Sequence, residues 1–302
     1  MFELLRVYVS ALATVAPLVM CGGVGFIWGK KRLSFDAHFI SNLVTLAGVP
    51  ALIFHTLYST EIENSALLEI GLVSTLALFL SLGLSALALK YLKFERRPNL
   101  QIVSFPNSGN LGLPLSALAF GEIGLSVAIV FFAICTFLHN TVGLRTISDS
   151  RDGSHGKILV MGSAIAAIAA RLGGISLPNW LLDGLELIGS VTVPLMLLSL
   201  GVTLASISTK GLRAGSVIAG LRLSVGFISA VVICWLLGTP TALAPIIVLQ
   251  MTMPCAVIGY VYVAKFAPEN GQVAASAVLV STLVFLATSP LLIAGLKYFY
   301  PH

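Results

Sequence analysis

Charged side chains are scarce in this sequence. Of its 302 residues only 10% are Asp, Glu, Lys or Arg, whereas 57% are hydrophobic. Soluble domains carry about 25% charged residues, so the composition predicts an integral, all-helical membrane protein. The formal net charge of +5 comes largely from lysines and arginines between apolar runs. It informs the orientation of the chain in a membrane and does not favour nucleic acid as a partner.

Motifs for metal binding, cross-linking and catalysis are also lacking. The four cysteines lie in apolar runs and form no CxxC pair, which argues against a zinc site or a disulfide framework. No GxxxxGK[ST], HExxH or GxSxG motif occurs. We therefore expect no enzyme, no ATP-driven motor, no cofactor and no metal site. No Asp or Glu lies deep in an apolar run, so the coupling ion of any transport stays open between Na⁺ and H⁺.

What the sequence does contain is about ten apolar runs, each near the length of about 20 residues that a spanning helix needs. The first run lacks a cleavage-site pattern, so we expect a retained helix and no signal peptide. A polar stretch at 146–157 predicts a central cytoplasmic loop between a first five-helix repeat (1–145) and a second (158–302). The expected spans lie near 5–29, 37–59, 66–89, 98–120, 122–144, 158–177, 184–207, 212–237, 242–266 and 273–299.

Basic residues cluster in alternate loops, after the first, third, fifth and seventh expected spans. Loops rich in Lys and Arg face the cytoplasm, so both termini are predicted to be extracytoplasmic. With five spans in each half, the halves enter the membrane in opposite directions, which predicts a 5+5 inverted repeat. Prolines support it, because they occur in the second and fourth spans of each half, at Pro50, Pro106, Pro194 and Pro254. Coincidence is the alternative, since prolines are common in membrane helices.

The stretch FPNSGNLGLP, residues 105–114, lies within the fourth expected span. Prolines and glycines oppose a continuous helix there, and broken backbone at membrane depth is tolerated where it lines a cavity or is buried in protein. We predict a discontinuous helix whose Asn107, Ser108, Asn110 and Pro114 contribute to a substrate site. The alternative is a kink in which the asparagines bond only to the backbone.

The ninth expected span contains LQMTMPCAVIGY, residues 249–260, and is predicted to break at a similar depth. Two antiparallel broken helices crossing at the midplane would present both kinds of helix end to one pocket. Gln250 lies one turn before Pro254, and it either binds a ligand or caps carbonyls that the proline leaves free. Thr252 is a weaker candidate, because threonine readily bonds to its own helix.

Of four further polar residues, three have two open roles each. Arg222, in the eighth span, would neutralise an anion, or would snorkel to the basic loop or pair. Arg171 is expected near the membrane interface. His55 and His139, near the outer ends of the second and fifth spans, either relay protons or have a packed or interfacial role.

Three segments resemble the auxin efflux carrier family, the PIN-like permeases, in its compact bacterial type. FPNSGNLGLPLSALAFG (105–121) is similar to the family's fourth span, and VPALIF (49–54) to its second. MPCAVIGYVYVAKF (253–266) is similar to its ninth span, although Gly259 stands near a second proline of plant members. By motif match, Asn107, Pro114 and Pro254 carry over as site residues, whereas Ser108, Asn110 and Gln250 come from the local physics.

The resemblance implies more than the spacing shows. It implies a scaffold of helices 1, 2, 6 and 7 that often forms a homodimer. It also implies a moving transport domain of helices 3–5 and 8–10, in an elevator-type movement. The implied substrates are small organic anions, auxin in plants and malate- or malonate-like carboxylates in bacterial relatives. The implied location is the bacterial inner membrane, with membrane lipid around the chain.

The leading hypothesis is therefore a secondary transporter of small organic anions that works by alternating access. A ligand-binding membrane receptor or sensor on a transporter-like fold is one alternative, although a signalling domain is expected for that role. A passive anion channel is another, and it predicts no saturation and no counterflow.

Overall fold

The structure is a computed structural model that describes residues 2–148, 155–207 and 210–300. Helices make up almost all of this part of the chain, and it contains no strand beyond one isolated bridge. The predicted all-helical class is confirmed. Of the predicted central loop 146–157, residues 149–154 lie outside the described residues.

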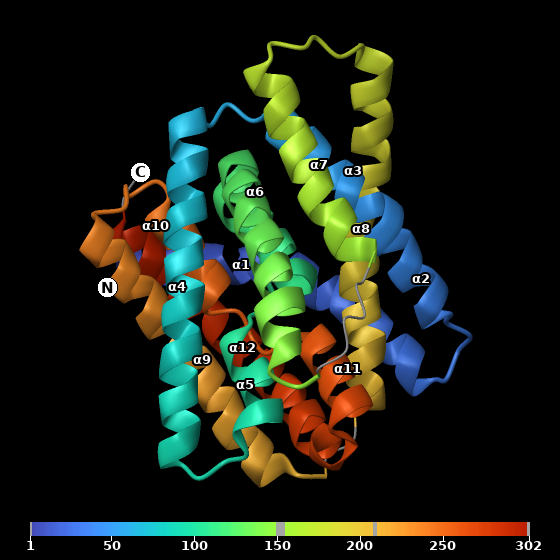
Figure 1. Cartoon of the computed structure of the whole chain (residues 1–302), viewed down its shortest axis with the longest axis vertical. Helices are drawn as coiled ribbons and strands as arrows, with labels where there is room; N and C mark the ends of the chain where they lie inside the picture. The colour runs from blue at the N-terminus through green and yellow to red at the C-terminus, as the bar shows by residue number, and fades with distance from the viewer. Residues whose placement is uncertain (1, 149–154, 208–209, 301–302) are drawn as a thin grey trace.

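Helices occupy all five ranges predicted for the first half, and three of the spans contain π-helical turns (Figure 1). The elements are α1 (Phe2–Lys30), α2 (Ala37–Leu43), η1 (Val44–Gly48), α3 (Val49–Ser59), α4 (Asn64–Tyr91), α5 (Arg96–Ser104), η2 (Ser108–Gly112), α6 (Leu113–Leu138) and η3 (His139–Gly143).

Helices also occupy the five ranges predicted for the second half. The elements are α7 (His155–Leu172), α8 (Asn179–Ser206), α9 (Leu212–Leu237), α10 (Ala244–Met251), α11 (Val257–Phe266), η4 (Pro268–Asn270) and α12 (Gly271–Phe299). The sixth predicted span runs too far, because α7 ends at Leu172, just before Gly173 and Gly174. Gly174 has a left-handed φ of 61°, which suits a glycine that ends a helix.

Seven helical stretches in the described residues are long and apolar enough to cross a membrane. The count is below ten for local reasons. The breaks near Pro106 and Pro254 shorten two stretches, and α7 is short. In addition, α6 joins the fourth and fifth predicted spans through a kink at Gly121, where φ is 65° and ψ is −150°. That backbone conformation is essentially restricted to glycine.

The side chains on the outside of the bundle are those of a protein surrounded by lipid. Large apolar residues such as Leu68, Leu187 and Trp235 are more than 70% exposed, which a water-soluble protein does not sustain over so many positions. Small residues allow close helix contacts inside. A Cβ on Gly25 of α1 would collide with the backbone of α8 at Leu198, as expected for glycine at membrane helix interfaces.

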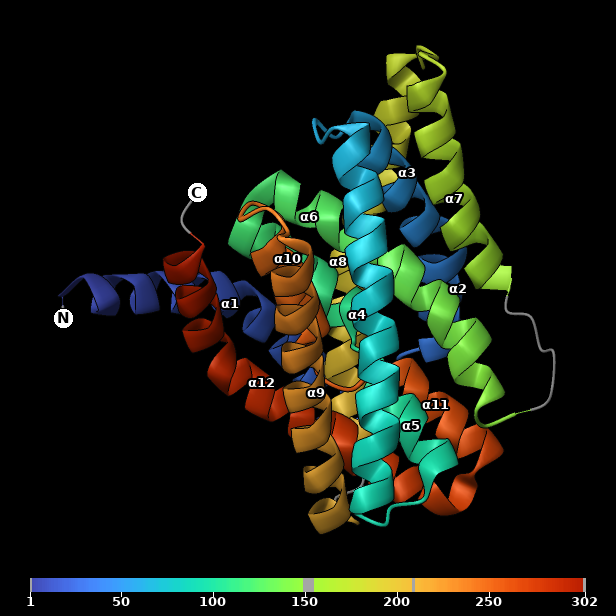
Figure 2. The same cartoon turned by 60° about the vertical axis from the view of Figure 1, so that its left-hand side comes forward.

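α4 and α9 pack against each other through the middle of the molecule, and the broken helices lie beside them. Figure 2 shows α5 and α11 toward one end of this pair and α10 with the upper part of α6 toward the other. The two breaks therefore lie between these ends, deep within the helical bundle.

Candidate functional site

The two helix breaks touch each other. Pro106, between α5 and η2, forms an antiparallel bridge with Cys255, between α10 and α11. The backbone N–H of Asn107 donates to the carbonyl of Pro254 over 2.8 Å. We call this contact the crossing, and define it as residues 105–108 and 252–256. The predicted break in the ninth span is present, since α10 ends at Met251 and α11 begins at Val257.

The structure gathers the six predicted site residues around the crossing. All of them are buried except Asn110, which is partly buried. The Gln250 side chain reaches from α10 to the other broken helix, where its Nε2 donates to Ser116 Oγ over 3.0 Å. Gly112 leaves room for this side chain, because a Cβ there would lie 2.4 Å from Gln250 Oε1. Two roles were left open for Gln250, ligand binding and capping of carbonyls in its own helix. Its Nε2 does not cap its own helix, because it donates to Ser116.

Prolines and asparagine set the local backbone. Pro114 lies in the first turn of α6, directly after the π-helical turn η2, and it supplies no N–H to the preceding turn. Asn107 has φ −76° and ψ 58°, outside the helical region, and its carbonyl accepts from the N–H of Gly112 over 3.1 Å. Thr252 bonds to the carbonyl of Val248 over 2.7 Å, as expected for a threonine that satisfies its own helix.

The ends of α5 and α10 that enter the crossing are both satisfied by Arg222. This arginine is fully buried on α9. Its Nη1 donates to the carbonyl of Val103 over 2.8 Å, and its Nη2 donates to the carbonyl of Met251. A Cβ on Gly226 would occupy the place of Nη2, so this glycine makes room for the guanidinium. Arg222 thus pairs with backbone and does not snorkel.

Further hydroxyl groups complete the support of the breaks. Ser81 Oγ donates to the carbonyl of Ser104 over 3.2 Å, and the N–H of Cys255 donates to Ser281 Oγ over 3.0 Å. The sequence interpretation missed Ser81, Ser116 and Ser281, and it gave Arg222 no capping role. The missing signal was tertiary, since serines occur throughout the apolar runs and nothing in the sequence distinguishes these three.

The half-helices that leave the crossing begin without a side-chain cap. This holds for η2, which starts at Ser108 and continues into α6, and for α11, which starts at Val257. The first N–H groups of a helix have no intrahelical partner and carry a partial positive charge. Beside them, Asn107 Nδ2 and Gln250 Oε1 are buried and have no hydrogen-bond partner. Unpaired buried polar groups are costly, and two of those found in the described residues lie here.

The electrostatics of the crossing therefore favour an anion. Arg222 neutralises the negative ends of the two incoming half-helices, and the positive ends of the two outgoing half-helices remain available. Among the described residues, no three His, Cys, Asp or Glu side chains cluster as a metal site requires. Asn107 can donate to a carboxylate, and Gln250 can accept from a hydroxyl or a protonated group.

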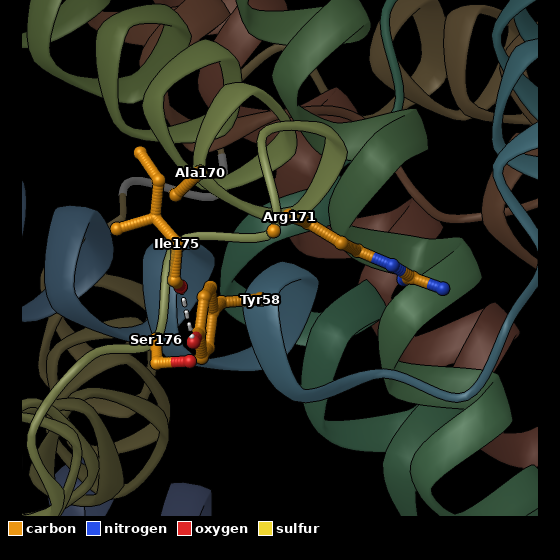
Figure 3. A pocket seen from close by; sticks show the side chains of 6 residues that line it. Tyr58, Ala170, Arg171, Ile175 and Ser176 are labelled. Carbon is orange, nitrogen blue, oxygen red and sulfur yellow. Dashed lines mark hydrogen bonds between the residues drawn. The ribbon is translucent and has the colours of Figure 1, made fainter.

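Two cavities lie away from the crossing. The larger, of about 310 Å³, is lined by Tyr58 on α3 and by Arg171, Ile175 and Ser176 at the end of α7 and beyond (Figure 3). Tyr58 Oη donates to the carbonyl of Ile175 over 2.8 Å, whereas Arg171 extends away from it and donates to the carbonyl of Ile62. These bonds join α3 and the segment after it to α7 and the loop that follows α7, and they leave Arg171 Nη1 buried without a partner.

The second cavity, of about 210 Å³, lies between η1 and α8 and is almost entirely apolar. Its lining includes Val44, Gly48, Val191 and Leu195. Such a groove suits an acyl chain or another helix, and it offers no group that would select an anion. The crossing is therefore the candidate functional site.

Comparison with known proteins agrees with this geometry. The model of a family described as "Membrane transport protein" matches residues 10–158. A protein of Methanothermobacter thermautotrophicus named "Uncharacterized transporter" is 26% identical over 300 residues, covering 93% of this chain and 96% of its own. An uncharacterized transporter of Methanocaldococcus jannaschii is 27% identical over 291 residues, covering 90% of this chain and 94% of its own. The resemblance to auxin efflux carrier-like membrane transport proteins, inferred above from the sequence motifs, is therefore confirmed.

Proposed function

We propose that the protein is a secondary transporter of small organic anions and that its substrate binds at the crossing. One observation carries the proposal. Two uncapped helix starts and the unpaired amide groups of Asn107 and Gln250 meet where Arg222 has already satisfied the opposing helix ends. A carboxylate at this place would accept from backbone N–H groups and from Asn107 Nδ2.

An inverted repeat of ten spanning segments is part of the proposal, and the helix packing supports it. Matching the halves in chain order pairs α1 with α7, the α2–α3 segment with α8, and α4 with α9. If each helix is replaced by its equivalent in the other half, the α1–α8 contact becomes the α7–α3 contact. Both contacts are extensive. The same exchange converts the α4–α6 contact into the α9–α12 contact, and leaves the α4–α9 contact unchanged.

Alternating access would follow from this arrangement. In an elevator-type movement, the third to fifth and the eighth to tenth predicted spans carry the crossing. They move past a scaffold made of the first, second, sixth and seventh predicted spans. The close α1–α8 packing at Gly25 supports a rigid scaffold. We further propose a homodimer in the inner membrane, surrounded by lipid, with both termini extracytoplasmic as the basic loops predict.

The proposal is tested with purified protein in proteoliposomes. Uptake and counterflow are measured with radiolabelled malate, malonate and indole-3-acetate. The wild type is expected to show saturable uptake and counterflow of at least one probe. Asn107→Ala should lower the uptake rate at low probe concentration by about 10- to 100-fold, which corresponds to one hydrogen bond to a charged group.

The matched control is Asn42→Ala. Asn42 is exposed on α2 and bonds only to His38 among the contacts found for it, so this substitution should leave uptake unchanged. Equal uptake by wild type and Asn107→Ala would rule out the site. Flux without saturation or counterflow would instead favour a passive channel, and saturable binding without flux would favour a receptor.

A further inference from the structure

A second polar cluster lies beside the crossing, among α5, η3 and α11. Its central residue is His139, which is 3% exposed and whose ring stacks on Phe105 with centroids 4.3 Å apart and an interplanar angle of 7°. Tyr262 of α11 meets the same imidazole edge to face at 5.8 Å, and its hydroxyl donates to Asn140 Oδ1. Of these residues, Phe105 belongs to the crossing, whereas His139, Asn140 and Tyr262 lie outside it.

The cluster contains unused hydrogen-bonding capacity. Gln101 of α5 is fully buried, and both atoms of its side-chain amide have no partner. His139 Nε2 is buried and unpaired as well. The two side chains are neighbours, because a Cβ on Gly143 would lie 2.6 Å from Gln101 Oε1 and 3.1 Å from His139 Cδ2. Buried groups of this kind normally find partners, so their concentration in one place indicates an additional occupant.

His139 is chemically distinctive within the membrane part of the chain. Among the described residues, His139 and Arg222 are the only buried members of the Asp, Glu, Lys, Arg and His classes. Arginine stays charged in proteins, whereas histidine gains and loses a proton near neutral pH. His139 also starts the π-helical turn η3, and such turns occur frequently at functional sites.

The surroundings of His139 can respond to a proton. It faces Gln101 of α5, Phe105 directly after α5, and Tyr262 of α11, and Cys135 lies one turn earlier on α6. The charged group on the next packed helix, α9, is Arg222, which is held by carbonyls of α5 and α10. No carboxylate is buried in the described residues, so none competes for this proton.

We propose that His139 is the proton-binding site of a proton–anion symport; this rests on the transport function proposed above. A proton on Nε2 turns this atom into a donor that can bond to Gln101 Oε1. The imidazolium then lies on the face of Phe105, where a cation is favoured. Phe105 immediately precedes Pro106, so the new charge is placed next to the crossing.

The sign of the coupling follows from the charges. A positive charge at His139 favours an anion at the crossing, and by linkage the bound anion favours protonation of His139 to the same extent. The two ligands therefore bind together and cross the membrane together. An acidic outer compartment is expected to drive uptake, and an alkaline one to oppose it.

The experiment imposes a pH gradient of about one unit, acid outside, on proteoliposomes and follows radiolabelled malate, malonate and indole-3-acetate. Wild-type accumulation of a transported probe should rise by about tenfold, the ratio that one coupled proton supplies. His139→Gln should keep counterflow, which needs no net proton movement, and should lose the response to the gradient. His55→Gln, on a partly buried histidine of α3, is the matched control and should keep both.

A gradient response that persists in His139→Gln, or that is absent from the wild type, overturns the symport. If the wild type transports none of the probes, the proposed transport function is wrong. Proton binding by His139 is then tested separately. Histidine-ring NMR of the wild type, assigned by loss of one signal in His139→Gln, should then show a His139 ring signal that changes with pH. If His139→Gln loses counterflow as well, the same NMR titration of the wild type is the deciding test. A His139 ring signal that does not change with pH overturns the proton site.

Discussion

Arg222 offers the sharpest test of how the crossing is held together. Replacing it by methionine keeps a long side chain and removes both hydrogen bonds, to Val103 and to Met251. Each bond joins a charged donor to a buried carbonyl, and each is worth about 1.5–3 kcal/mol. Arg222→Met should therefore lower the free energy of unfolding by about 3–6 kcal/mol, which is large against the roughly 5–15 kcal/mol typical of native proteins.

The measurement is equilibrium unfolding in mixed lipid–detergent micelles, followed by the loss of helical circular dichroism. Arg213→Met on the same helix is the matched control. It removes an exposed positive charge and should change the stability by no more than about 0.5 kcal/mol. Equal stability of Arg222→Met and Arg213→Met would refute the capping role, and with it the argument that the negative helix ends are neutralised before substrate binds.

Two further predictions concern a glycine within the fourth predicted span and the glycine that directly follows it. Gly112→Ala places a methyl group against the Gln250 amide and should reduce anion uptake strongly, whereas Gly71→Ala, which has room beside Ile134, should leave uptake unchanged. Gly121→Ala forces alanine into a conformation of φ 65° and ψ −150° and should cost about 1–3 kcal/mol of unfolding free energy; Gly162→Ala, with open space around it, should cost nothing. An unimpaired Gly112→Ala would separate Gln250 from the site, and an unaffected Gly121→Ala would show that the kink relaxes without penalty.

Local chemistry predicted the framework of the fold well. Apolar length located the helical ranges, and the density of proline, glycine and asparagine at 105–114 located the first break. Pro254 located the second. The end of α7 was missed by about five residues, because Ile175 and Leu177 prolong the apolar run past the glycines that end the helix.

The contacts that complete the site could not be predicted from the sequence. Arg222 and Val103 are 119 positions apart in the chain, and Gln250 and Ser116 are 134 apart. An arginine near a basic loop has the same local sequence whether it snorkels or points inward, so only the packing of α9 against α5 and α10 decides. His139 is similar, since its stack on Phe105 joins two spans that the sequence could not align.

Equilibrium binding to the purified protein tests the central claim most directly. Scintillation-proximity binding with labelled malate, malonate and indole-3-acetate compares the wild type with Asn107→Asp, which places a negative charge at the crossing, and with Asn42→Asp on the surface. The account predicts saturable binding of at least one probe by the wild type and by Asn42→Asp, with at least about tenfold weaker binding by Asn107→Asp, the effect of about 1.4 kcal/mol. Equal affinities of all three proteins, or no binding of any carboxylate by the wild type, would contradict an anion site at the crossing.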